Sequence, residues 1–218
     1  MADSDAVAVI GIGRFGESLA RELMSQGTEV LVIDSSEQTV QRLAGEVTHA
    51  VTADATDEQA MRQLGLDEFS RVAVGIGSNL EASILTCSTL RTLEVPSIWA
   101  KAISAAHARI LTQLGVDHVI RPEHDTGRRI AHLVAGRLLD YIELDDGYAI
   151  AKMHPPRALL DTPLGETGIR RRHGVTVIGV KESGEAFHHA SADTVVGAGS
   201  LIIVSGARRD VERFSELG

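Results

Sequence analysis

The sequence has few of the residues that build disulfide scaffolds, metal clusters or membrane spans. It contains a single cysteine, Cys87, in 218 residues, which excludes an intramolecular disulfide and a cysteine-rich metal site. Cys87 lies within a helical pattern of apolar residues, so we expect a small buried hydrophobe. No apolar run approaches the roughly 18 residues that a membrane-spanning helix needs. The absence of disulfides fits a reducing cytosol, and a partner would have to do any membrane spanning.

Positive charge is also scarce. The chain has 21 lysines and arginines against 30 aspartates and glutamates, a formal net charge of −9. This balance argues against a nucleic-acid partner, because such surfaces draw their affinity from neutralising phosphates. The densest basic run, Arg170–Arg172, is typical of a solvated helix end. Residues 1–6 are acidic and lack a basic segment, so we expect no signal peptide there.

The first part of the chain alternates short β-branched runs with helical patterns. Near-continuous apolar strands that alternate with helices are typical of a parallel sheet covered on both faces. Because crossovers between parallel strands are right-handed, the pattern predicts a doubly wound, Rossmann-like α/β domain. The expected strands are 7–10, 29–33, 49–51, 71–76, 98–100 and 118–120, and the clearest helices are 57–65, 79–93 and 104–114.

The pattern changes after Pro122, which lacks an N–H donor and so ends the last parallel strand. We expect one helix at about 124–139, followed by a small α+β module. Its expected strands are 141–144, 148–153, 175–180 and 200–204, with a final helix around Val211 and Phe214. The sequence therefore predicts two domains, residues 1–138 with the crossover helix included and residues 139–218.

A glycine motif opens the first expected helix. Gly11, Gly13 and Gly16 form G-x-G-x-x-G between a strand and a helix, which is the context that dinucleotide-binding folds require. The first glycine permits the turn, the second lets a phosphate approach the backbone, and the third allows close packing. Asp34 ends the next strand, where its carboxylate would hold ribose hydroxyls and repel a 2′-phosphate, which disfavours NADP. We therefore expect a nucleotide at this turn.

Arg14 adds a positive charge beside these glycines. A guanidinium makes bidentate contacts with phosphate oxygens, and the terminal phosphate of a triphosphate would use it better than a dinucleotide pyrophosphate. The alternative is a solvated residue in the first helical turn. The residue type alone leaves both interpretations open.

Six segments in order resemble one known family. They are Ala8–Gly16, Val32–Asp34, Ala53–Thr56, Gly75–Asn79, Ile98–Lys101 and Arg121–Gly127. Together they are similar to the RCK (KTN) regulatory subunits of bacterial Trk/Ktr potassium uptake systems, of the KtrA/TrkA type. The resemblance covers nearly the whole chain, with RCK-N (TrkA-N) and RCK-C (TrkA-C) domains.

The resemblance implies a cytoplasmic protein, peripheral to the inner face of the cell membrane, that is not an enzyme. It implies dimers forming an octameric ring docked on a membrane potassium-translocating subunit of the KtrB/TrkH type. In this family ATP favours the active ring and ADP the inactive one, so the chain would gate a transporter according to its bound nucleotide.

The family's nucleotide contacts carry over by position. Arg14 would meet the γ-phosphate, Asp34 and Ser36 the ribose, and Lys101 the triphosphate. The complete expected set is Gly11, Gly13, Arg14, Phe15, Gly16, Asp34, Ser35, Ser36, Asp54, Ala55, Thr56, Gly77, Asn79, Lys101 and Glu123. Residues 54–56 would frame the adenine, while Gly77 and Asn79 would lie beside the phosphates. Ser36 and Asp54 each stand where relatives often carry Asn, which leaves the details of ribose and adenine recognition open.

Glu123 is the expected metal ligand. A carboxylate near a polyphosphate is repulsive unless a hard cation such as Mg²⁺ or Ca²⁺ bridges them, and the resemblance places Glu123 there from the intersubunit side. The alternative is a carboxylate that stabilises a helix N-terminus through the macrodipole.

The second module resembles a cyclic di-AMP receptor of Gram-positive relatives, with Ile169, Arg170 and His173 near the matching segment. An exposed structural arginine is the alternative, and Ala190 stands where a proline is usual. His188 and His189 are adjacent on an expected strand and point to opposite faces, so we do not expect a shared metal.

Three other functions are alternatives for a chain with this nucleotide-binding pattern. An NAD-dependent oxidoreductase would need an acid–base residue beside the nicotinamide, and the remaining residues offer no such constellation. A redox-sensing repressor would need a DNA-binding helix pair and a basic face. An RCK subunit that senses NAD/NADH instead of ATP/ADP is the closest alternative, and competition between the nucleotides would separate the two.

Overall fold

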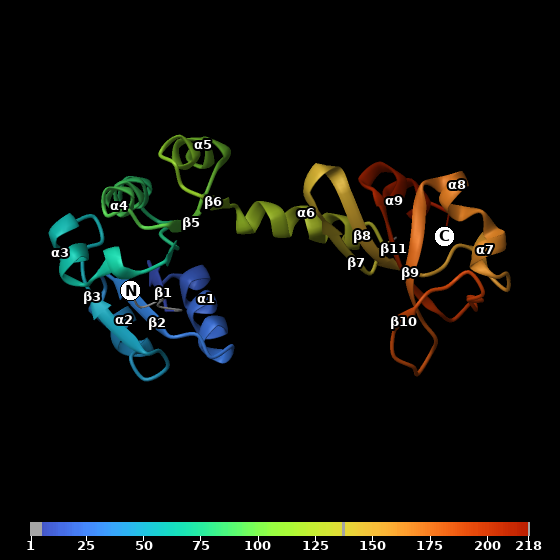
Figure 1. Ribbon diagram of the computed structural model, residues 1–218, viewed down its shortest axis with the longest axis horizontal. Coiled ribbons are helices and arrows are strands. Elements are labelled where there is room, and N and C mark those ends of the chain that lie inside the picture. The colour runs from blue at the N-terminus through green and yellow to red at the C-terminus, as the bar shows by residue number, and fades with distance from the viewer. Residues whose placement is uncertain (1–5, 137, 218) are drawn as a thin grey trace. The chain divides into compact units, whose positions relative to one another are not determined.

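The computed structural model describes residues 6–136 and 138–217. These residues form two compact units that divide between Glu123 and His124 (Figure 1). The expected domain boundary at 138/139 remains a prediction. None of the described helices combines the length and apolar character that crossing a membrane requires.

Unit 1 contains a six-stranded sheet in which every neighbouring pair is parallel. The strands are β1 Val7–Ile10, β2 Val30–Asp34, β3 His49–Thr52, β4 Arg71–Val74, β5 Ser97–Lys101 and β6 His118–Ile120, and the helices are α1 Arg14–Ser25, α2 Glu37–Leu43, α3 Glu58–Gln63, α4 Leu80–Thr92 and α5 Ala105–Gln113. The order β3-β2-β1-β4-β5-β6 is that of the Rossmann fold. The predicted doubly wound sheet is confirmed.

The strands alternate their side chains between two apolar layers. Val9 and Val32 pack with Ala20 of α1 and Leu43 of α2. The opposite face packs against α3, α4 and α5, through buried side chains such as Met61, Cys87 and Leu111 with Ile10 and Ile33. Cys87 is the expected buried hydrophobe, and burial raises the pKa of its thiol to about 12.

The helix α6 spans Pro122–Val134, so the expected helix at 124–139 is displaced toward the N-terminus. Pro122 begins the helix because a proline tolerates the first helical turn. Gly136, with φ of 78°, takes the left-handed conformation just after the last turn, and its N–H donates to the carbonyl of Leu133. A glycine in this position ends a helix, which the apolar pattern did not reveal.

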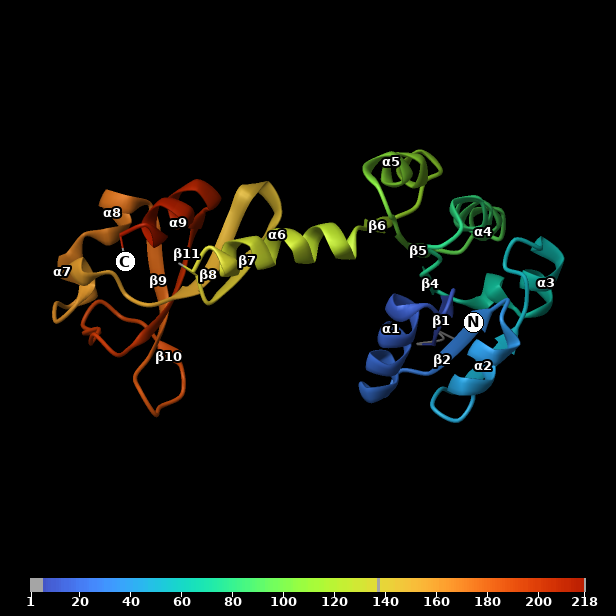
Figure 2. The same ribbon diagram turned by 180° about the vertical axis from the view of Figure 1, so that it is seen from behind.

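Unit 2 is built on an antiparallel sheet of order β10-β9-β11-β8-β7 (Figure 2). Its strands are β7 Asp140–Glu143, β8 Tyr148–Met153, β9 Val175–Lys181, β10 His188–His189 and β11 Leu201–Ala207, and its α-helices after α6 are α7 Leu164–Thr167, α8 Ile169–His173 and α9 Arg208–Ser215. Val211 and Phe214 of α9 pack into the core beneath one face of the sheet. The small α+β module is therefore confirmed, while the short elements α7, α8 and β10 escaped the sequence pattern.

Candidate functional site

One edge of the parallel sheet collects the polar and glycine residues that the sequence singled out. In a parallel sheet the carboxyl ends of all strands meet at the same edge. In the spatial order of the strands β3, β2, β1, β4, β5 and β6, the residues at or just after these ends are Asp54, Asp34, Gly11, Gly75, Lys101 and Glu123. The reversal of strand order, between β1 and β4, falls at the glycine turn, and such switch points are where α/β folds bind ligands.

The three glycines of the turn have three different packing environments. Gly11 has φ of +84°, and a Cβ there would lie 2.8 Å from the backbone N of Ile76. A Cβ on Gly16 would lie 2.2 Å from the carbonyl oxygen of Gly11. At Gly13, by contrast, a Cβ would meet nothing within 4 Å. Gly11 and Gly16 are therefore glycines for internal packing, whereas Gly13 leaves its backbone open to an approaching group.

The N-terminus of α1 differs from those of the four helices that follow it. The caps of α2 to α5 all accept a hydrogen bond from the first turn through their side chains, and they are Ser36, Asp57, Asn79 and Ser104. Gly13, the cap of α1, has no side chain to do this. The first N–H groups of a helix have no intrahelical acceptor and carry partial positive charge. The start of α1 is thus suited to bind an anion, with the exposed Arg14 beside it.

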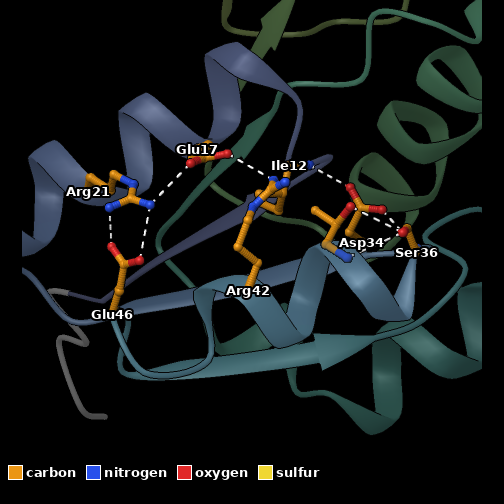
Figure 3. A network of polar contacts seen from close by, with 8 residues as sticks. Ile12, Glu17, Arg21, Asp34, Ser36, Arg42 and Glu46 are labelled. Carbon is orange, nitrogen blue, oxygen red and sulfur yellow. Dashed lines mark hydrogen bonds and ion pairs between the residues drawn. The ribbon is translucent and has the colours of Figure 1, made fainter.

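Asp34 connects the glycine turn to the second strand. One carboxylate oxygen accepts from the backbone N–H of Ile12 at 2.6 Å, and the other accepts from the backbone N–H of Ser36 at 2.8 Å (Figure 3). The carboxylate is therefore held beside the turn by two backbone amides. Since each oxygen has a second lone pair, Asp34 can still accept from hydroxyl groups.

An ion-pair network ties α1 to α2 next to this carboxylate. Glu17 accepts from Arg21 at 3.1 Å and from Arg42 of α2 at 2.9 Å, and Arg21 also pairs with Glu46 (Figure 3). Glu17 lies in the first turn of α1, where a negative charge is favourable. The partners are exposed, so each pair stabilises the fold by about 1 kcal/mol or less. The network helps to hold α1 and α2 together beside Asp34.

The remaining expected residues near the adenine end have local structural tasks. Asp54 accepts from the backbone N–H and the hydroxyl of Thr56, and these hydrogen bonds lower the pKa of Asp54. Ala55 packs into the core. The hydroxyl of Ser36 accepts from Thr39, consistent with its position as the cap of α2. These contacts orient the loop after β3 and the start of α2.

Lys101 and Glu123 meet at the opposite end of the strand-end row. The Lys101 Nζ donates to a Glu123 carboxylate oxygen at 2.6 Å and lies 5.9 Å from the centre of the Phe15 ring. A Cβ on Gly77 would lie 3.6 Å from the same nitrogen. The hydrogen bond from Lys101, helped by the backbone N–H of Glu123 and by the charges of Lys101 and Arg14, lowers the pKa of Glu123. The Lys101 ammonium is therefore where three other expected residues from distant segments meet, namely Phe15, Gly77 and Glu123.

The residues expected to form a second site in unit 2 divide between core and surface. Ile169 is buried in the apolar core, and His173 packs its ring against Phe214. Arg170 is exposed and donates from its Nε to the Thr176 hydroxyl at 3.0 Å. Within residues 6–136 and 138–217, no group of three or more His, Cys, Asp or Glu side chains is placed to hold a metal ion.

Sequence reasoning left two features of the site unassigned. Gly75 was part of a resembling segment but was not assigned to the site, and a Cβ there would lie 2.7 Å from the Gly11 carbonyl. The other is the hydrogen bond from the Ile12 amide to Asp34. Gly75 was detectable as a glycine directly after a strand, but no sequence signal reports a backbone amide that binds a side chain.

Comparisons with known proteins agree with this geometry. Residues 7–122 match the TrkA-N domain and residues 148–217 match the TrkA-C domain. The chain is 36% identical over 212 residues to the Ktr system potassium uptake protein A of Bacillus subtilis, which covers 97% of this chain and 96% of that protein. The chain belongs to the KtrA-type RCK family.

Other relatives support the same membership. The Ktr system potassium uptake protein C of Bacillus subtilis is 37% identical, over 96% of this chain and 95% of that protein. Among solved structures, the GsuK RCK domain has a TM-score of 0.66 at 22% identity. It covers 97% of this RCK chain, which spans 47% of that one. At this identity the likeness shows the fold alone.

Proposed function

We propose that the chain is a cytosolic regulatory subunit that binds an adenine nucleotide and gates a membrane potassium-translocating subunit of the KtrB/TrkH type. The observation that carries the nucleotide assignment is the start of α1. Its cap, Gly13, has no side chain and faces open space, while the four following helices have side-chain caps. Curated relatives that match the full chain are named for potassium uptake, which supports the transport role.

The strand-end row offers a place for each part of an adenine nucleotide. Phosphates would take the N–H groups at the start of α1, and the ribose would donate to the Asp34 carboxylate. The adenine would lie near residues 54–56, and Ser35 and Ser36 would border the ribose. Gly77 and Asn79 would lie near the phosphates. This placement follows the order of the strands and supports an adenine nucleotide over a small unphosphorylated ligand.

We propose that Arg14 distinguishes ATP from ADP, and that ATP activates the regulatory subunit whereas ADP inactivates it. A ligand shifts an equilibrium between two shapes only by its difference in affinity for them. The Arg14→Ala variant should bind ADP nearly normally and lose the preference for ATP. Isothermal titration calorimetry with both nucleotides measures this, and Arg109→Ala, on the exposed surface of α5, is the charge-matched control. An unchanged ratio of the two Kd values would sink the assignment.

An NAD(H)-sensing subunit is the second candidate. It is favoured by one observation, that a solved neighbour, with a TM-score of 0.64, is named as the GsuK channel bound to NAD. Competition of NADH against labelled ATP tests it, since the two ligands would share the start of α1. Tighter binding of NADH than of either ATP or ADP would favour the NAD(H)-sensing subunit. An absorbance change of the nicotinamide with a small substrate would instead overturn the non-enzymatic role.

Glu123 is proposed as the protein ligand of a divalent cation, Mg²⁺ or Ca²⁺, at the phosphates. A single carboxylate is a weak site by itself, so phosphate oxygens and water would complete the shell. Nucleotide titrations with and without Mg²⁺ test this, because the cation should strengthen ATP binding and the Glu123→Gln variant should abolish that gain.

We also propose a homo-oligomer, built from dimers into an octameric ring. Exposed apolar side chains on two elements support this. No residue of α6 is buried, and Val134 is 80% exposed. In the sheet of unit 1, Trp99 stacks on His118 with ring centres 3.8 Å apart and is 41% exposed. Light scattering after size exclusion, with nucleotide present, measures the mass, and a clean monomer would contradict the ring.

Cyclic di-AMP in unit 2 remains a proposal, carried by the exposed Arg170 and the neighbouring His173. Ile169, which is buried, would contribute only by positioning them. Calorimetry with cyclic di-AMP on the wild type and on Arg170→Ala decides the question, and equal heats from both proteins would contradict it.

A further inference from the structure

The Lys101 side chain is mostly enclosed by its neighbours, whereas that of its carboxylate partner is largely exposed. The Lys101 side chain is 13% exposed, with the Phe15 ring and Gly77 beside its ammonium group. The Glu123 side chain is 66% exposed. Of the two partners in this 2.6 Å hydrogen bond, the carboxylate is therefore the one with solvent beside it.

The ion pair occupies the end of the site where phosphates would lie. Lys101 ends β5 and Phe15 lies in the first turn of α1, one residue after Arg14. The charge of Arg14 adds to the effects that lower the pKa of Glu123. A phosphate bound at the start of α1 would thus approach an ammonium group that already has a negative partner.

We propose that the Lys101–Glu123 ion pair is a latch that closes the phosphate end of the site and opens when a polyphosphate takes Lys101. This inference rests on the proposed nucleotide function and adds to it how affinity is set. The carboxylate acts as an internal substitute for a phosphate oxygen. Because two anions near one ammonium repel each other, an arriving phosphate competes with Glu123 for Lys101, and the carboxylate moves away from the phosphate unless a cation bridges the two.

The latch lowers affinity only for ligands that reach Lys101. Binding of such a ligand breaks the Lys101–Glu123 ion pair. The net gain in binding free energy is therefore smaller than that of the new contact with Lys101. Adenosine has no phosphate and leaves the latch closed. The ion pair therefore sets the affinity for ADP and ATP without affecting the adenine and ribose contacts, and Glu123 becomes a residue that determines specificity.

The test is a titration of the full chain with ATP, ADP and adenosine in the presence of EDTA. Glu123→Gln removes the charge and keeps the shape, and should tighten ATP and ADP roughly two- to fivefold, the range of exposed ion pairs, while the Kd of adenosine stays unchanged. EDTA removes any cation, so a metal role for Glu123 cannot contribute. The exposed Glu29, just before β2 at the opposite edge of the sheet, supplies the control variant Glu29→Gln.

A double-mutant cycle separates the latch from simple repulsion between Glu123 and the phosphates. In the Lys101→Gln background the ion pair is already absent, so Glu123→Gln should no longer tighten ATP. If the tightening persists there, the carboxylate acts by its charge alone and the latch is overturned. Normal wild-type binding with an unchanged Kd for Glu123→Gln also overturns the latch and leaves the nucleotide function standing. A wild type that binds no adenine or nicotinamide nucleotide overturns both.

Discussion

The two units use the same kinds of residue to build different sheets. Unit 1 has parallel strands whose carboxyl ends share one edge, and that edge holds the glycine turn, Asp34, Lys101 and Glu123. Unit 2 has antiparallel strands, so its loops are divided between both edges. Strand direction therefore controls where functional residues meet. A parallel sheet brings residues from six segments to one edge, whereas an antiparallel sheet places consecutive loops at opposite edges.

The largest expected effect comes from a substitution that opens a cavity in the core of unit 2. Phe214 is 2% exposed, and Phe214→Ala should lower the free energy of unfolding of unit 2 by about 3–5 kcal/mol. If the nucleotide site lies wholly in unit 1, the Kd of ADP should change less than twofold. Chemical denaturation and calorimetry measure the two effects. Phe187→Ala is the control, because Phe187 is 39% exposed. If Phe214→Ala weakened ADP binding as well as the stability of unit 2, the site would not lie wholly in unit 1.

The next test acts on the glycine turn of unit 1. An alanine Cβ at Gly16 would press on the carbonyl of Gly11, so Gly16→Ala should destabilise unit 1 by about 1–3 kcal/mol and weaken ADP at least tenfold. The matched control is Gly127→Ala, a helical position in α6 where a Cβ meets nothing within 4 Å. That change should be neutral or stabilising. Normal ADP binding by Gly16→Ala would refute the packing role of this glycine.

A smaller effect is expected at Asp34. Asp34→Asn leaves one of the two backbone amides with a neutral acceptor and the other facing an NH2 group that cannot accept, which should cost about 1–2 kcal/mol of stability in unit 1. Adenine nucleotides should bind about tenfold more weakly, as ribose hydroxyls lose a carboxylate. Asp57→Asn is the control, since asparagine caps a helix as well as aspartate does. Equal nucleotide affinity in both variants would remove Asp34 from the site.

The smallest expected effect is a dependence of the stability of unit 1 on pH. His107 is 1% exposed, its Nδ1 accepts from the Ile103 amide at 3.4 Å, and burial lowers the pKa of His107. The folded unit 1 therefore keeps this ring neutral while the unfolded chain protonates it. Stability is fully present above the ordinary pKa of about 6.5 and declines as the pH falls toward the lowered value, by about 1 kcal/mol or less down to pH 5.5.

The measurement is chemical denaturation of the full chain at several pH values, from which the free energy of unfolding of unit 1 is obtained. His107→Leu should flatten the decline below pH 6.5, with His49→Leu, at an exposed position, controlling for the loss of one histidine. An identical decline in His107→Leu and the wild type would assign the effect to other groups.

Much of unit 1 was predictable because its signals are local. Glycines 11, 13 and 16 follow a strand and open a helix, and each has the packing that its position predicts. The length of α6 was not predictable from apolar spacing, because Leu138 and Leu139 continue the pattern while Gly136 ends the helix. In unit 2, α7 and α8 are helices of four and five residues, too short to show a helical period.

Residue types at fixed spacing were enough to predict the alternating α/β pattern, the glycine turn and membership of the RCK family. The ion pair between Lys101 and Glu123, 22 positions apart and beside Phe15, and the hydrogen bond from the Ile12 amide to Asp34 became visible only in the folded chain. The physical reason is that spacing along a chain sets local backbone geometry. Which charges meet depends on the order and direction of the strands that carry them.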